Sequence, residues 1–142
     1  MGVQLKQLSD SSMGLEGTDF NTGAFIYVNV PYTVTSPLTM TGVVLPRKCV
    51  VQSVSVNPDV SATNAVTVQA FAALNTVALG SGTAITSAGA ALNGVAGTNV
   101  LGTLSAVSGA LLVQAGSRVG VVISGALGAA GSGVITIALN PA

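Results

Sequence analysis

Short runs in which apolar side chains alternate with polar or small ones are the feature that most restricts the fold of this chain. Such runs occupy residues 23–30, 49–56, 64–74, 117–125 and 133–140. A period of two residues places alternate side chains on opposite faces of a β-strand, whereas an amphipathic helix repeats about every 3.6 residues. No long helical pattern occurs between the runs, so the sequence predicts an all-β chain.

The number and spacing of the runs indicate the architecture. We expect roughly eight to ten short strands, at the spacing typical of a sandwich or barrel. Residues 75–100 are predicted to form loops and short strands, with a short helix near 84–92 as the alternative. A single antiparallel β-sandwich of the jelly-roll type is favoured. An immunoglobulin-like sandwich is the alternative, although the sequence has neither a Trp nor a pair of Cys residues.

Two strands carry more specific expectations. Pro31 is expected to end or interrupt the strand over 23–30, or to mark it as an edge strand. In the run over 49–56, we predict that Val50, Gln52, Val54 and Val56 share one face, opposite Cys49. The Asn-Pro-Asp sequence at 57–59 then predicts a turn.

The chain of 142 residues suits one domain with a polar N-terminal extension. Residues 1–22 show no sustained periodicity and are interpreted as an extended arm, with a disordered tail as the alternative. Residues 23–142 form the predicted sandwich. The last 24 residues carry no charge, but residues 60–117 are equally uncharged and glycines break the C-terminal segment. We therefore expect no transmembrane helix there.

Charged side chains are scarce and balanced in sign. They make up 6% of the residues, with four cations and four anions, whereas about 25% is usual. A zero net charge argues against a nucleic-acid partner and against a basic membrane-binding face. A surface of hydroxyls, amides and small apolar groups suits packing against copies of the same chain or a large partner. The alternative is a small neutral domain that these polar groups keep soluble.

The residue types leave little scope for catalysis. The chain has no histidine, which excludes a Ser-His-Asp triad and a Cys-His pair. One cysteine can form neither an internal disulfide nor a zinc site by itself. The carboxylates match neither a calcium loop nor a glycosidase pair. No phosphate-binding loop occurs. We expect no enzyme, no metal site and no cofactor.

The stretch "VVLPRKCVVQSVSV" at 43–56 holds the only cysteine, directly after two cations. Arg47 and Lys48 would lower the pKa of the Cys49 thiol, but no general base is evident. Because Cys49 begins an alternating run, we predict a buried structural thiol. Arg47 and Lys48 are then expected in an exposed turn, where they are candidate contacts for an acidic partner.

Aromatic side chains cluster in the N-terminal third. Four of the five lie between Phe20 and Tyr32. Phe25 and Tyr27 are expected on one strand face, where they belong to the core or a subunit interface, with a sugar-binding platform as the alternative. The candidate partner contacts are Lys6, Asp10, Glu16, Asp19, Phe20, Phe25, Tyr27, Tyr32, Arg47 and Lys48.

A family resemblance adds to these inferences. A polar arm precedes "FIYVNV", then "TGVVLPRKCVVQSVSV", then Ala/Thr/Gly-rich strands that end in "SRVGVVISG" and "GVITIALNPA". Over residues 23–142 this order resembles the small jelly-roll cement, or decoration, proteins of tailed-bacteriophage capsids. The resemblance carries over no catalytic residues.

The resemblance implies a structural virion protein on the outer capsid surface. Such a protein binds the major capsid protein and itself, as dimers or trimers, and stabilises the shell; a dimer is slightly favoured. The alternative is a receptor- or glycan-binding sandwich of a phage fibre or tail.

Overall fold

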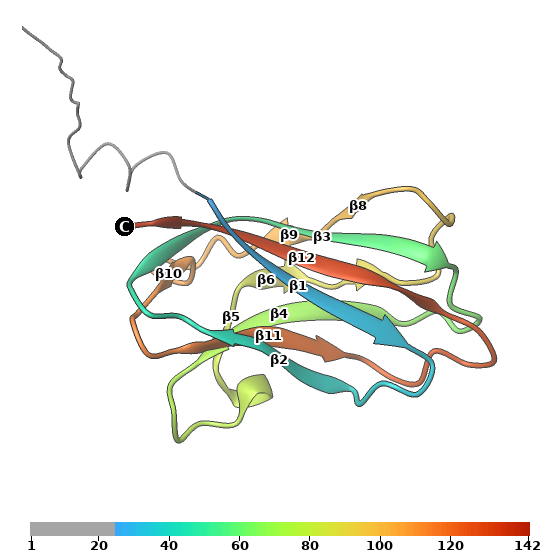
Figure 1. Ribbon diagram of the computed structural model, residues 1–142, viewed down its shortest axis with the longest axis horizontal. Coiled ribbons are helices and arrows are strands. Elements are labelled where there is room, and N and C mark those ends of the chain that lie inside the picture. The colour runs from blue at the N-terminus through green and yellow to red at the C-terminus, as the bar shows by residue number, and fades with distance from the viewer. Residues whose placement is uncertain (1–24) are drawn as a thin grey trace, which may run out of the picture.

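The computed structural model describes residues 25–142 as one all-β unit (Figure 1). Two five-stranded antiparallel sheets pack face to face, and a two-stranded sheet lies beside them. The predicted antiparallel sandwich is therefore confirmed. The predicted arm over residues 1–22 lies outside the described residues. The same holds for the candidate contacts Lys6, Asp10, Glu16, Asp19 and Phe20.

The first sheet, which we call the β1 sheet, contains the strands β1 (Ile26–Thr33), β12 (Ser132–Pro141), β3 (Cys49–Val60) and β10 (Leu112–Val113) in that order, with β8 (Val100–Leu101) also paired to β3. The second, the β2 sheet, contains β2 (Thr39–Val44), β11 (Arg118–Ile123), β4 (Thr67–Ala73) and β5 (Thr83–Ala84), with β7 (Ala90–Ala91) also paired to β4. The remaining elements are β6 (Thr86–Ala88), β9 (Thr103–Leu104) and the 3-10 helix η1 (Leu79–Ser81).

The strand pairing identifies a jelly roll. β1 pairs with β12, β2 with β11, β3 with β10, and β4 with β5, all antiparallel. The main strands thus pair from the two ends of the chain inwards, as one long hairpin that is rolled up into two sheets. This is the jelly-roll order, and it confirms the preference over an immunoglobulin-like sandwich.

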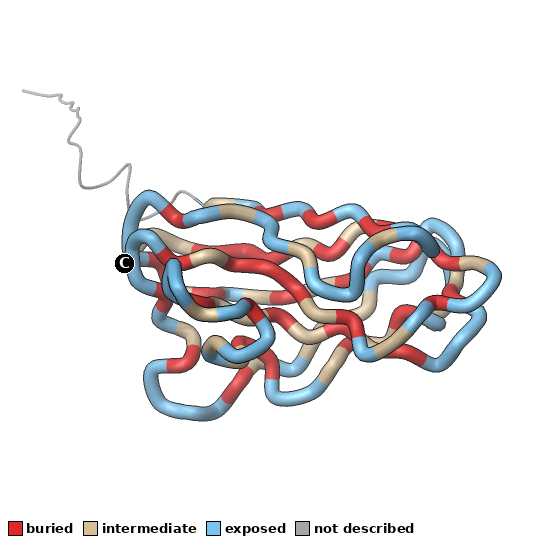
Figure 2. The backbone as a smooth tube through the Cα atoms, turned by 90° about the horizontal axis from the view of Figure 1, so that it is seen from below, coloured by how far each residue is buried: buried red, intermediate tan, exposed pale blue. Residues whose placement is uncertain are grey.

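The core lies between the two sheets. Ile135, Ile137 and Leu139 of β12 are fully buried, and they face Val119 and Val121 of β11, which are also fully buried. Figure 2 shows buried and exposed positions that alternate along the strands. The alternation predicted for the runs over 64–74, 117–125 and 133–140 is confirmed. These runs supply the central strands of both sheets.

One predicted strand face is wrong because β3 contains a bulge. The register between β3 and β12 shifts by one residue at Gln52. A bulge residue has no partner across the ladder, and it reverses which face the residues before it occupy. Cys49 and Val51 therefore lie on the same buried side as Val54, while Val50 is only half-buried and Gln52 is exposed.

The predicted turn at 57–59 is also wrong. β3 continues to Val60, and Pro58 is buried in it opposite Gly133. The Pro58 carbonyl accepts a hydrogen bond of 2.7 Å from the Gly97 N–H. Pro31, in contrast, lies exposed within β1, which pairs only with β12. Its prediction as the mark of an edge strand is confirmed, because an edge strand tolerates the missing N–H.

The connection from β4 to β5 folds against the outer side of the β2 sheet. Residues 83–91 form the short strands β5, β6 and β7, so the short helix considered for 84–92 does not form. Leu79 of η1 is 2% exposed. Gly120 of β11 allows this contact, since a Cβ atom at Gly120 would overlap the Met40 carbonyl oxygen and lie 2.7 Å from Leu79 Cδ2.

Candidate partner-binding surface

Phe25 and Tyr27 form an exposed aromatic pair. Phe25 is 49% exposed and Tyr27 is 62% exposed. Their ring centroids are 5.9 Å apart and their planes are inclined by 26°, so the rings stack. The prediction that they share a face is confirmed. Because both rings reach solvent, neither belongs to the core of this chain. Two of the predicted roles are left for the pair: a partner interface or a platform that binds a ligand.

The strand register extends this pair into a patch. Tyr27 lies opposite Ala138 of β12, and Asn140, two residues further along β12, is on the same face. Asn140 lies opposite Val50 of β3, which lies opposite Leu112 of β10. Directly opposed residues of antiparallel strands share one face of the sheet. Leu112 is 40% exposed, while Val50 and Asn140 are half-buried. We call Phe25, Tyr27, Val50, Leu112 and Asn140 the aromatic patch; it covers the outer face of one end of the β1 sheet.

The patch contains an unsatisfied polar atom. The side-chain oxygen Oδ1 of Asn140 is buried and has no hydrogen-bond partner among the described residues. A buried acceptor without a donor costs about 1–3 kcal/mol relative to one that is hydrogen-bonded.

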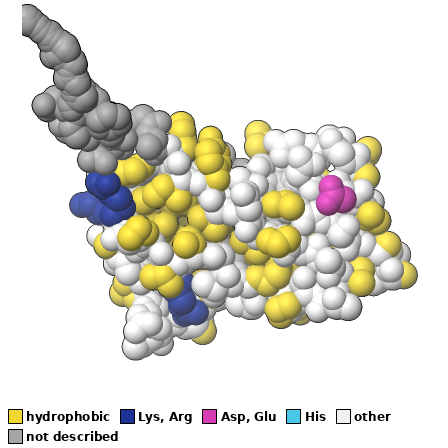
Figure 3. Space-filling model, viewed as in Figure 1, with side chains coloured by type: hydrophobic (Ala, Val, Ile, Leu, Met, Phe, Trp, Pro, Cys, Tyr) yellow, Lys and Arg dark blue, Asp and Glu magenta, His cyan; other side chains and the backbone are white. Residues whose placement is uncertain are grey.

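Arg47 and Lys48 border the aromatic patch. They follow β2 in the loop that leads to β3, and both are exposed, as predicted. The Lys48 carbonyl accepts a hydrogen bond of 3.0 Å from the N–H of Ala142, directly after β12. This bond ties the loop to the end of β12 that carries Asn140. Figure 3 shows dark-blue cationic side chains at this end of the sandwich, beside gathered apolar side chains.

Cys49 lies beneath this surface and is a core residue. It is free and fully buried, and its Sγ donates a hydrogen bond of 3.4 Å to the Arg47 carbonyl. Burial raises the pKa of the Cys49 thiol, and the charge of Arg47 opposes this only in part. The thiol is therefore neutral near pH 7, which agrees with the predicted structural role.

We predict that Cys49 reacts slowly with a disulfide-exchange reagent such as DTNB in the folded protein. Labelling then requires local opening, so the rate should fall at least ~1000-fold below that in denaturant. The measurement is the time course of thiolate release at pH 8 with and without urea. Labelling of the folded chain at the rate of an exposed thiol would contradict the buried assignment.

Tyr32 was predicted to contact a partner, and the structure corrects this prediction. Its side chain is 1% exposed and belongs to the core, so it offers no surface to a partner. The Tyr32 hydroxyl is buried without a hydrogen-bond partner among the described residues. Burial, with a smaller contribution from Asp59, raises the pKa of this hydroxyl. Tyr32 falls on the inner face because it has the same parity as Val28 and Val30 in β1.

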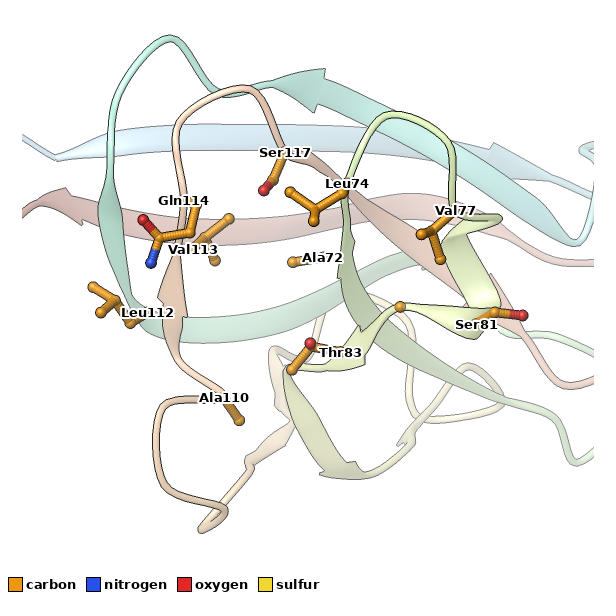
Figure 4. Close-up of a pocket in the computed structure, with 11 residues that line it drawn as sticks. Ala72, Leu74, Val77, Ser81, Thr83, Ala110, Leu112, Val113, Gln114 and Ser117 are labelled. Carbon is orange, nitrogen blue, oxygen red and sulfur yellow. The ribbon is translucent and has the colours of Figure 1, made fainter.

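A cavity of about 400 Å³, which shares Leu112 with the aromatic patch, opens between the edges of the two sheets, where β5 and β10 lie (Figure 4). Leu74, Val77 and Leu112 give it apolar walls, and Gln114 and Ser117 add an amide and a hydroxyl. None of the residues that line it is charged. It therefore has no acid–base pair for catalysis, and it offers a ligand only apolar contacts and neutral hydrogen-bonding groups. No local motif marks it, because its walls come from distant segments.

Among residues 25–142, no group of three or more His, Cys, Asp or Glu side chains comes together. Within the same range, no helix is long and apolar enough to cross a membrane.

Comparisons with known proteins give one structural similarity. No protein-family model matches the sequence, and no curated protein matches it. A chain of the solved structure described as the cyanophage Pam1 capsid asymmetric unit is similar, with a TM-score of 0.45 and 17% sequence identity. The match covers 96% of this chain and 99% of that chain. Similarity this low carries no function from one chain to the other.

Proposed function

We propose that this chain is a capsid cement, or decoration, protein that binds the outer surface of a tailed-phage shell and stabilises it. Its partners are the major capsid protein and further copies of itself, and it acts without catalysis. The observation that carries the proposal is the aromatic patch, an exposed stacked pair bordered by Arg47 and Lys48 on an otherwise weakly charged jelly roll.

The surface chemistry of the domain suits attachment to a lattice. The charged side chains among the described residues are Arg47, Lys48, Asp59 and Arg118. Aromatic side chains and Arg are enriched in protein interfaces, whereas Lys, Glu and Asp are depleted there. A repeated shell also multiplies weak contacts, because neighbouring copies that touch each other bind with avidity. The family resemblance of residues 23–142 points to the same role.

A second candidate function is a receptor- or glycan-binding module of a phage fibre or tail. The observation that favours it is the exposure of the Phe25 and Tyr27 rings. In the next row of the β1 sheet, Thr136 Oγ1 donates a hydrogen bond of 2.8 Å to Asn29 Oδ1. Aromatic faces next to amides and hydroxyls are a common surface for sugar rings.

The two functions separate in a binding experiment. The purified chain is sedimented with empty shells assembled from the major capsid protein of its own phage, and the same preparation is applied to a glycan array. The cement proposal expects saturable binding to shells at a fixed ratio of copies and no glycan binding. Glycan binding without shell binding would contradict the cement proposal and support the fibre or tail function.

We further predict that the double variant Arg47→Ser/Lys48→Ser binds shells about tenfold more weakly at low salt, because two charged contacts are lost. The salt dependence of binding should shrink as well, since exposed charges are screened within about 10 Å at 0.1 M salt. Asp59→Ser is the matched control, because Asp59 is an exposed charge at the other end of β3. If the double variant and wild type bind with equal affinity and equal salt dependence, Arg47 and Lys48 do not contact the shell.

A further inference from the structure

The charges of the chain are divided between its two parts. Residues 1–24 carry a net side-chain charge of −2, from Lys6, Asp10, Glu16 and Asp19. Residues 25–142 carry a net charge of +2, from Arg47, Lys48, Arg118 and Asp59. The N-terminal segment and the domain are therefore electrostatically complementary, although the whole chain is neutral.

The positive charge of the domain is concentrated at the aromatic patch. Arg118, on β11, is only half-exposed, and its guanidinium donates a hydrogen bond to the Val77 carbonyl in the β4–β5 connection. Arg47 and Lys48 are exposed beside the patch, and Asp59 lies near the far end of β3. An acidic partner therefore finds cations and aromatic rings at one place.

The same charges disfavour a symmetric contact through this patch. A two-fold dimer buries the same patch of both copies. It would bring two pairs of Arg47 and Lys48 into one interface, where like charges repel. The patch instead fits a different surface, one that carries carboxylates.

We propose that the acidic N-terminal segment of one copy, residues 10–19, docks on the aromatic patch and the Arg47/Lys48 loop of a neighbouring copy. Its carboxylates pair with the two cations, and Phe20 extends the aromatic contact. The contact lies between copies of this chain, so it does not depend on shell binding.

The length of the segment permits this arrangement. When fully extended, the segment reaches up to about 50 Å from the domain at Asp10 and up to about 20 Å at Asp19. A domain of this size has a radius of gyration of about 13 Å, so Asp10 can reach past its full width, whereas Asp19 can reach only a patch close to the start of the segment. If two copies exchange segments reciprocally, the contact closes a two-fold dimer in which the two patches do not meet, and if the exchange runs one way it closes into a ring when its rotation allows. The contact therefore excludes only the dimer in which patch faces patch.

Charge reversal in separate chains tests the proposal. One variant reverses the patch, Arg47→Glu/Lys48→Glu, and the other reverses the segment, Asp10→Lys/Glu16→Lys/Asp19→Lys. Sedimentation velocity over a concentration series at low salt should show that wild type associates and that each variant associates at least about tenfold more weakly. An equimolar mixture of the two variants should recover association between unlike chains, as dimers or even-numbered rings, because each segment meets a complementary patch only on the other variant. Asp59→Lys is the control and should behave as wild type.

Three results would overturn the proposal. The first is wild-type association in both variants. The second is a wild type that stays monomeric across the concentration series. The third is a mixture that does not recover association while one chain with both reversals behaves as wild type, which would indicate docking within the same chain. Circular dichroism checks that each variant is folded. If a charge-reversed variant does not fold, the corresponding neutral variant, Arg47→Ser/Lys48→Ser or Asp10→Asn/Glu16→Gln/Asp19→Asn, is used in its place.

Discussion

Gly120→Ala is expected to lower the free energy of unfolding by about 3 kcal/mol, because the new methyl group has no space in a well-packed site. Gly120 lies in β11 at a register shift against β2, and a Cβ atom there would overlap the Met40 carbonyl oxygen. It would also lie 2.7 Å from Leu79 Cδ2. The backbone of β2 and the η1 connection would both have to move, and the buried contact of Leu79 with the sheet would loosen.

Gly80→Ala is the matched control for this prediction. A Cβ atom at Gly80 would lie 3.6 Å from Val122 Cγ2, which is an ordinary contact. Its effect should stay within about 1 kcal/mol of zero. Urea denaturation of both variants and wild type, with equal m-values, supplies the comparison. Equal midpoints for the two variants would show that the close approach at Gly120 does not hold in solution.

Deletion of residues 1–22 is expected to leave a folded jelly roll that attaches to shells about 100-fold more weakly, because linked contacts act with avidity. The described core comes entirely from residues beyond this segment, from Val28 of β1 to Leu139 of β12. The segment carries three of the four carboxylates of the chain. Its loss would remove both its own contacts and the proposed link between copies.

Thermal unfolding and shell binding of the truncated chain check this prediction together. The melting temperature should change little, while the amount of chain that sediments with shells falls. Full-length protein with Asp10→Asn/Glu16→Gln/Asp19→Asn is the control, which keeps the length of the segment and removes its acidic charge. Undiminished shell binding by the truncated chain would show that residues 1–22 carry no contact.

The sequence predicted the strands that lie in the middle of the sheets. β11 and β12 are paired on both sides and bury one complete face, so Val119, Val121, Ile135 and Ile137 show the alternation clearly. The jelly-roll order also agreed with the resemblance in strand order. These are the regions in which burial alone decides which residues occupy each face.

The errors have local physical causes. Gln52 forms a bulge, and an ordinary glutamine gives no sign that the faces exchange at that point. The turn expected around Pro58 rested on local preference, which the pairing of β3 with β12 overrides. Tyr32 could have been placed in the core from its parity with Val28, but the sequence left open whether Pro31 ends the strand or only marks it as an edge strand. β1 tolerates Pro31 at its exposed edge.

The candidate surface was predictable only in part. Phe25 and Tyr27 share a face by simple alternation, and Arg47 with Lys48 stood out by their charge. Asn140, Val50 and Leu112 join them only through the pairing of three strands, which no local pattern specifies. The unpaired Asn140 Oδ1 is likewise a property of the folded packing.

The central claim is that this chain binds a phage shell and makes it more resistant to rupture. The most direct measurement is the rupture temperature of DNA-filled shells that lack the chain, followed by release of dye-accessible DNA as purified protein is added. The cement proposal predicts that the rupture temperature rises with added protein and reaches a plateau at saturation. A rupture temperature that stays constant while the chain is bound would contradict the stabilising role, and no binding at all would contradict the proposed function itself.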